Sequence, residues 1–278
     1  MCILSNAHTH TNLCDGKNTA EEMILAALAA GFSALGFSGH SYTPFDPESC
    51  MSLQKTEQYI SEITALKEKY ASQIAIYLGL ELDYYSQIDL SPYQYIIGSV
   101  HYLKDPQTGI YYSIDNTEEE FIAALDKMFK GEIMHMIEQY YRQVVAMAQR
   151  SSTTILGHFD LIKKLNHGNR FFLEDSNSYK KIALSALEEA VKTDCIFEIN
   201  SGGVYRNYTK EPYPATFLLE KLQELQKPLL ISSDCHTSDS VDFYFSEMKH
   251  KLADMGFKEI TVLGENGFQK QPLLKKAN

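Results

Sequence analysis

Six histidines and three carboxylates stand at, or just beyond, the ends of short apolar runs in this chain. They are His8, His10, Asp15, His40, Glu81, His101, His158, Asp234 and His236. Imidazole nitrogens and carboxylate oxygens are ligands that zinc, manganese and iron accept in proteins. One catalytic zinc usually takes three protein ligands plus water, so nine candidates suit two or three divalent ions if a carboxylate bridges them. The residue types therefore predict a multinuclear metal site, and they do not choose among these metals.

The spacing within this set supports the same prediction. His8 and His10 are two residues apart and follow the apolar run Cys2-Ile3-Leu4. Asp234 and His236 repeat this spacing near the end of the chain. On a β-strand, such a spacing puts both side chains on one face. Glu81 follows a mid-chain apolar run and is the natural bridging ligand. The remaining histidines lie on helical or loop segments and are expected to be structural or surface residues: His135, His167 and His250.

The apolar runs that precede these residues are typical of β-strands, and they alternate with segments of helical periodicity. A capping box is expected where Thr19 precedes Glu22 by three residues, and Gly31 should end that helix. Helices are expected over 19–30, 52–70, from about 117, and over 132–150, 177–192, 214–226 and 240–255, with a last short strand at 259–263. Strand and helix thus alternate about seven times, which favours a parallel sheet with right-handed crossovers.

The distribution of the ligands along the strands favours a barrel over an open sheet. An open doubly wound sheet usually gathers its ligands at one crevice, whereas here they follow six different strands. A closed barrel brings so many strand ends to one rim. We therefore predict the α/β class and a TIM-like barrel of about seven strands. No linker rich in Gly, Pro or Ser divides the chain and no internal repeat is evident, so residues 1–278 are expected to form a single domain.

The bulk composition excludes several classes of function. Hydrophobic residues make up 44% of the 278 residues, which is enough for a full core. A net charge of −11 argues against a sequence-independent nucleic-acid binder, which needs a basic face. The N-terminus lacks a signal-peptide pattern, and no apolar run approaches the roughly 20 residues of a membrane span. We expect no nucleic-acid or membrane partner, and the sequence does not indicate an oligomeric state.

The cysteines indicate a reducing compartment. Their number is odd and no CxxC pair occurs, so a disulfide framework is not expected: Cys2, Cys14, Cys50, Cys195 and Cys235. The cytoplasm is the simplest location. Cys14 and Cys235 neighbour candidate ligands, but they are expected to be small buried hydrophobic residues rather than ligands.

Taken in order, the motifs resemble those of the polymerase-and-histidinol-phosphatase (PHP) family, and within it the histidinol-phosphatase branch. They are His8-Thr9-His10-Thr11, Asp15, Gly39-His40, Gly79-Leu80-Glu81, Gly98-Ser99-Val100-His101, Gly157-His158-Phe159-Asp160 and Ser233-Asp234-Cys235-His236. The segments 200–206 and 211–214 are similar to the sixth-strand region of that branch. Other branches place a histidine where Asp15 stands, so this aspartate adds support for the histidinol-phosphatase branch.

The resemblance implies a distorted (β/α)7 barrel and a trinuclear centre of divalent ions, either zinc, manganese or iron. One ion would be held by His8, His10, Glu81 and Asp234. A second would be held by Glu81, His101 and His158. A third would be held by Asp15, His40 and His236.

The activity expected from this resemblance is hydrolysis of L-histidinol phosphate to L-histidinol and phosphate, a step of histidine biosynthesis. A hydroxide bridging two ions would attack phosphorus in line with the leaving oxygen. Asp234, His236 or metal-bound water would protonate that oxygen, and the sequence leaves this choice open. Arg206 and Lys163 are expected to bind phosphate, although the branch often carries arginine where Lys163 stands.

Aromatic residues near the rim suggest a site for the organic half of the substrate. Tyr42 and Tyr102, together with Phe45 and Tyr205, could wall an imidazole-sized pocket, although each could equally pack the loops. Two alternatives remain. The same metal centre could serve another phosphate ester, such as a phosphotyrosine protein or a nucleotide. The chain could also be a non-catalytic metal-binding scaffold, which the complete ligand set disfavours.

Overall fold

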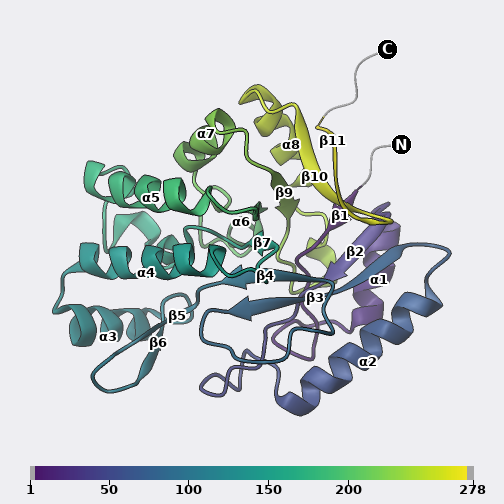
Figure 1. The fold of residues 1–278 in the computed structure, drawn as a ribbon, viewed down its shortest axis with the longest axis horizontal. Helices are drawn as coiled ribbons and strands as arrows, with labels where there is room; N and C mark the ends of the chain where they lie inside the picture. Colours follow the sequence, from purple (N-terminus) through teal and green to yellow (C-terminus); the bar gives the residue numbers. More distant parts are fainter. Residues whose placement is uncertain (1–3, 274–278) are drawn as a thin grey trace.

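Seven strands form one parallel sheet, and their order in the sheet follows the chain. In the computed structural model, which describes residues 4–273, this order is β1-β2-β3-β4-β7-β8-β9 (Figure 1). The strand bounds are β1 Ser5–Asn6, β2 Ala34–Phe37, β3 Ala75–Asp83, β4 Tyr95–Ser99, β7 Ile155–Leu156, β8 Ile196–Asn200 and β9 Leu229–Ser232. Cys2 and Ile3, expected in the first strand, lie outside the described residues. The sheet curves into a nearly closed barrel surrounded by helices, so the predicted distorted (β/α)7 barrel is confirmed.

The barrel closes just beyond the ends of its first and last strands. Thr9 forms a parallel bridge with Cys235. The main-chain nitrogen of His10 donates to the oxygen of Cys235 (3.0 Å), and the nitrogen of Cys235 donates to the oxygen of His8 (3.3 Å). We call this pairing of residues 8–10 with residue 235 the seam. It sets the His-x-His motif directly beside the Asp-x-His motif, which the sequence places more than two hundred residues apart.

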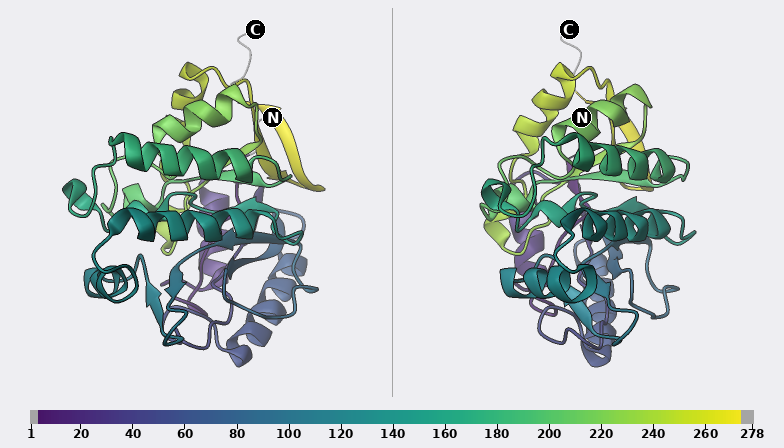
Figure 2. Two further views of the ribbon diagram at one scale, coloured as in Figure 1. Left: turned by 60° about the vertical axis from the view of Figure 1, so that its left-hand side comes forward. Right: turned by 90° about the vertical axis from the view of Figure 1, so that its left-hand side faces the viewer.

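Helices follow most strands and cover the outside of the barrel. Their bounds are α1 Ala20–Ala29, α2 Leu53–Lys69, α3 Glu118–Phe129, α4 Ile133–Ala148, α5 Asn177–Ala190, α6 Gly202–Tyr205, α7 Thr216–Glu224 and α8 Phe245–Asp254. Figure 2 shows α4 and α5 lying side by side on this outer layer. The predicted capping box of α1 is confirmed, since Thr19 accepts from the nitrogen of Glu22 and the Glu22 carboxylate accepts from the nitrogen of Thr19.

A large side chain, Tyr95, packs among buried residues of several barrel strands. Tyr95 lies between strands, and its hydroxyl donates to the main-chain oxygens of Ala7 (2.5 Å) and Phe37 (3.1 Å). A Cβ atom at Gly79 would lie 2.2 Å from the Tyr95 ring, and one at Gly36 would lie 2.3 Å from its hydroxyl. Only glycine fits at these two positions, because the tyrosine occupies the space of two side chains. The packed interior leaves the carboxyl-end rim as the place for a site.

Two hairpins lie outside the predicted alternation. An antiparallel pair, β5 (Tyr102–Lys104) with β6 (Tyr111–Ser113), follows β4 near the rim. A second pair, β10 (Glu259–Gly264) with β11 (Gly267–Pro272), packs against β1, β2 and β9 and supports the barrel near its first and last strands. The strand expected at 259–263 therefore exists but adds no barrel strand. The helix expected over 240–255 begins only at Phe245, because a 3-10 turn at Ser238–Ser240 and the left-handed Tyr244 (φ 68°) precede it. Within residues 4–273, no helix is long and apolar enough to cross a membrane.

Candidate metal centre

Glu81 lies at the centre of the polar cluster on the carboxyl-end rim. It stands on β3, is almost fully buried, and receives Ser99 Oγ at 2.7 Å on its Oε1 atom. Five imidazoles approach its two oxygens. Oε2 lies 3.2 Å from His8 Nε2, 3.4 Å from His10 Nε2 and 2.9 Å from His40 Nδ1. Oε1 lies 2.9 Å from His158 Nε2 and 3.3 Å from His101 Nε2. The carboxylate is thus placed where a bridging ligand would stand.

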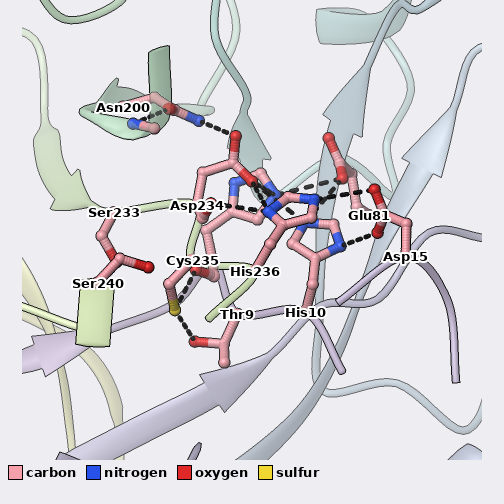
Figure 3. A network of polar contacts seen from close by, with 12 residues as sticks. Thr9, His10, Asp15, Glu81, Asn200, Ser233, Asp234, Cys235, His236 and Ser240 are labelled. Carbon is pink, nitrogen blue, oxygen red and sulfur yellow. Dashed lines mark hydrogen bonds and ion pairs between the residues drawn. The ribbon is translucent and has the colours of Figure 1, made fainter. Parts of the chain in front are cut away.

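The two other carboxylates lie on either side of His10. Asp234 Oδ1 is 3.2 Å from His10 Nε2, and Asp15 Oδ1 is 3.4 Å from His10 Nδ1. Asp15 Oδ2 is also 3.0 Å from His236 Nε2 (Figure 3). The His10 and His236 rings stack with their centroids 4.0 Å apart. The structure thus brings all nine residues expected to be ligands into one cluster.

The free atoms of this cluster fit divalent cations. Five buried atoms of these nine residues have no hydrogen-bond partner among the described residues: Nε2 of His8, Nε2 of His10, Oε2 of Glu81, Oδ1 of Asp15 and Nδ1 of His158. Buried polar atoms without a partner are costly, and bound divalent ions would give such atoms partners. Ligand atoms within 4.8 Å of one another form three overlapping groups: His10, Asp15, His40 and His236; His8, His10 and Glu81; and His40, Glu81 and His101.

These groups differ in detail from the sets that the resemblance implies. His10 and His40 each belong to two groups, and neither His158 nor Asp234 belongs to any. Both nevertheless contact the cluster, His158 through Glu81 and Asp234 through His10. The nine residues therefore lie close together, and the groups that they form share His10, His40 and Glu81.

The charges in the cluster stabilise one another. Burial opposes the positive charge on His8, but the carboxylates of Glu198, Asp234 and Glu81 outweigh it and raise the pKa of His8 to about 10. Burial likewise opposes the negative charge on Glu81, and the surrounding imidazoles hold its pKa well below the ordinary value. The carboxylates thus favour the charged form of His8, and the imidazoles favour the charged form of Glu81.

Further polar residues orient the candidate ligands, and the sequence analysis did not identify them. Glu198 Oε1 lies 2.5 Å from His8 Nδ1, and its Oε2 accepts from the main-chain nitrogen of His158 (2.8 Å). Asp83 Oδ2 lies 3.4 Å from His101 Nδ1. Carboxylates on the far nitrogen of a metal-binding imidazole fix its tautomer and orientation. The signal in the sequence is a single glutamate inside the apolar strand β8, because a buried carboxylate there requires a partner.

A cavity of about 200 Å³ opens above the cluster. Seven of the nine candidate ligands line it, while His8 and His10 lie outside its lining. Its remaining lining comes from the surrounding loops: Asp46, Ser49, Tyr102, Ser113, Asp115, Asn116, Leu161, Lys164, Arg206 and Tyr208. Tyr102 is therefore placed at the cavity as expected. Tyr42 is not among the described residues that line it.

Arg206 and Lys163, the two residues expected to bind phosphate, lie in different surroundings. Arg206 lines the cavity, where Nη2 is 3.0 Å from Asp234 Oδ2 and Nη1 is 3.0 Å from His236 Nδ1. Lys163 instead is buried, is not part of the cavity lining and pairs with Asp160 Oδ2 at 2.9 Å. The next residue, Lys164, lines the cavity and pairs with Asp115 at 2.9 Å. Both lysines lie at the 3-10 turn Leu161–Lys163. Because such a turn has three residues, the side chains of consecutive residues point in different directions.

The fold is a parallel barrel, and a cluster rich in histidines and carboxylates lies at its carboxyl-end rim. These two features define the class of α/β-barrel proteins with a candidate multinuclear metal centre. The model of the PHP domain family matches residues 6–202. The chain belongs to the PHP domain family.

Curated relatives extend the similarity along most of the chain. A Deinococcus radiodurans protein named "Probable histidinol-phosphatase" is 30% identical over 272 residues, which cover 94% of this chain and 97% of that protein. The histidinol-phosphatase of Bacillus subtilis is 28% identical over 265 residues, which cover 86% of this chain and 96% of the relative.

Solved structures share the fold. The crystal structure of histidinol phosphate phosphatase from Lactococcus lactis, in complex with Zn, L-histidinol and phosphate, superposes with a TM-score of 0.70 at 20% identity. The match covers 95% of this chain and 98% of the Lactococcus protein.

Proposed function

We propose that this protein is a metal-dependent phosphomonoesterase that hydrolyses L-histidinol phosphate to L-histidinol and phosphate, as a step of histidine biosynthesis in the cytoplasm. The observation that carries this proposal is the Glu81 carboxylate, which lies within 3.4 Å of five imidazoles at the floor of a cavity lined by Arg206. The names of the curated relatives and the L-histidinol in the Lactococcus structure support this substrate. We propose that residues 1–278 form one catalytic domain.

The proposed cofactors are three divalent ions, of zinc, manganese or iron. The sets proposed to hold them are His8, His10, Glu81 and Asp234; Glu81, His101 and His158; and Asp15, His40 and His236. When bound, such ions polarise phosphoryl oxygens and lower the pKa of water, so that a nucleophile is present at neutral pH. The zinc in the Lactococcus structure and the unpartnered buried ligand atoms support this assignment.

Arg206 is placed to bind the substrate's phosphate. Its guanidinium lies at the cavity wall between Asp234 and His236, so it remains oriented when the substrate arrives. A guanidinium can donate two parallel hydrogen bonds to phosphoryl oxygens and stabilise the charge that develops on them. Asp234 and His236 line the same wall, and we propose that one of them or a water molecule gives a proton to the leaving alkoxide.

Lys164, rather than Lys163, is the second cation available to the phosphate. Lys164→Ala should raise KM for L-histidinol phosphate roughly tenfold, because a charge-assisted hydrogen bond to the phosphate is lost. It should also lower Tm, since it leaves the mostly buried Asp115 without its ion-pair partner. Lys163→Ala should destabilise the fold by about 3–5 kcal/mol without a comparable change in KM, since it leaves the buried Asp160 without its ion-pair partner. Steady-state kinetics and thermal unfolding of both variants test this. A KM effect confined to the Lys163 variant would contradict the assignment.

A comparison of substrates tests the proposed function. Protein loaded with zinc or manganese should release phosphate from L-histidinol phosphate much faster than from phosphotyrosine or nucleotides, measured as kcat/KM from initial rates of phosphate release. Comparable rates on all three would contradict the specific assignment while leaving a phosphatase. No turnover of any ester by metal-loaded protein would favour the non-catalytic scaffold.

A further inference from the structure

The cavity contains a carboxylate that neither the metal centre nor the phosphate cations use. Asp46 lies on the loop between β2 and α2 and lines the cavity. Each of the other carboxylates in the lining has a basic partner at 3.0 Å or less: Asp15 with His236, Glu81 with His40, Asp115 with Lys164, and Asp234 with Arg206. Asp46 forms no ion pair with any residue between 4 and 273. It therefore brings an uncompensated negative charge to the cavity.

The Asp46 carboxylate is nevertheless held in place. The main-chain nitrogen of Ser49 donates to Oδ1 at 3.1 Å, and the hydroxyl of Tyr102 donates to Oδ2. Tyr102 itself is buried, and it packs against Phe45 at a centroid separation of 4.9 Å. Each carboxylate oxygen can accept about two hydrogen bonds, so both oxygens keep acceptor capacity beyond these contacts. An oriented carboxylate with free acceptor sites is suited to bind a hydrogen-bonding cation.

The strand order places this carboxylate across the mouth from the phosphate cations. Asp46 follows β2, Lys164 follows β7 and Arg206 follows β8. In the sheet, β3 and β4 separate β2 from β7, and across the seam β1 and β9 separate β2 from β8. The two ends of the cavity therefore differ in charge. The basic side chains lie toward β7 and β8, and the unpaired Asp46 carboxylate lies toward β2.

We infer that Asp46 binds a protonated nitrogen in the organic half of the substrate, and so selects phosphate esters of amino alcohols over simple phosphate esters. This inference rests on the proposed function and names the residue that would determine its specificity. L-histidinol phosphate has two nitrogen groups of this chemistry, a primary ammonium and an imidazole. Both can donate a charge-assisted hydrogen bond to a carboxylate.

The test is the near-isosteric variant Asp46→Asn, with Glu48→Gln as its matched control. Glu48 lies on the same loop but is exposed and does not line the cavity, so its variant removes the same charge from outside the site. With L-histidinol phosphate, Asp46→Asn should lower kcat/KM roughly tenfold, mainly through KM, because a charge-assisted contact is lost. With p-nitrophenyl phosphate, which has no protonated nitrogen, the same variant should change kcat/KM by less than about twofold. Glu48→Gln should leave both unchanged.

Two further esters distinguish the nitrogen groups. If Asp46→Asn lowers kcat/KM for phosphoethanolamine but not for the deamino analogue of L-histidinol phosphate, the carboxylate contacts the ammonium. If it lowers kcat/KM for the deamino analogue but not for phosphoethanolamine, the carboxylate contacts the imidazole. Either pattern supports the role of Asp46.

Other results separate the two proposals. An equal loss on p-nitrophenyl phosphate and L-histidinol phosphate, or no loss on either, would overturn the role of Asp46 alone. Wild-type protein that hydrolyses p-nitrophenyl phosphate but not L-histidinol phosphate would overturn the proposed function.

Discussion

Glu81→Gln should reduce kcat for L-histidinol phosphate by at least about 1000-fold and lower the metal content of the purified protein. The substitution preserves size but removes the charge that faces five imidazoles. A neutral amide is a poor bridging ligand. Its NH2 group would also donate hydrogen bonds to the imidazole nitrogens that would otherwise coordinate a metal ion. Steady-state kinetics and elemental analysis of the same preparations measure both effects.

An exposed glutamate provides the control for this variant. Glu188 lies on the solvent side of α5, far along the chain from the cluster, and Glu188→Gln should keep wild-type turnover and metal content. Near-ultraviolet circular dichroism should show that Glu81→Gln keeps its tertiary packing. Full activity in a folded Glu81→Gln protein would refute the proposed ligand set, because no other carboxylate within residues 4–273 contacts so many of the histidines.

Removal of the metal should abolish turnover and lower the thermal stability of the fold. A ligand present at about 1000 times its dissociation constant stabilises a protein by about 4 kcal/mol. For a chain of this length, such a loss corresponds to a decrease in Tm of roughly 10 °C. Chelation followed by gel filtration should therefore give a folded, inactive protein, and addition of zinc or manganese should restore both turnover and Tm.

The metal content per chain makes this experiment quantitative. Near three ions per chain in fully active protein would support the proposed sets, and one ion per chain would require a different assignment of ligands. Full turnover with less than about a tenth of an ion per chain would refute metal dependence altogether.

The positions of the candidate ligands could be predicted from the sequence because parallel strands leave few choices. Residues that follow successive parallel strands must meet at one rim, so the apolar run before Glu81 or His101 already indicates where that side chain lies. That His8 and Asp234 would be neighbours was implied by the family resemblance and not by the strand pattern, and the structure places His8 Nε2 3.5 Å from Asp234 Oδ1. Their contact at the seam depends on this closure and on no local pattern.

The residues that the sequence analysis missed depend on side-chain direction within short turns or on contacts between distant strands. Whether Lys163 or Lys164 faces the cavity is decided by one step of a 3-10 turn, which has no periodic pattern to reveal it. Glu198 is marked in the sequence only as a charged residue in an apolar strand, and its partner His8 is identified only when the fold is known. Asp46 lies in an irregular loop, where the ion pairs of its neighbours, rather than its own type, make it distinctive.

The seam also determines when the site can exist during synthesis of the chain. His8 and His10 leave the ribosome more than two hundred residues before Asp234 and His236, which complete their surroundings. Contacts of such large sequence separation form late, because the cost of closing the intervening loop must be met first. A nascent or truncated chain that ends before residue 234 therefore lacks both the bridge that closes the barrel and part of the ligand set. Complete uptake of the proposed ions would thus report that the whole barrel has been made and has folded.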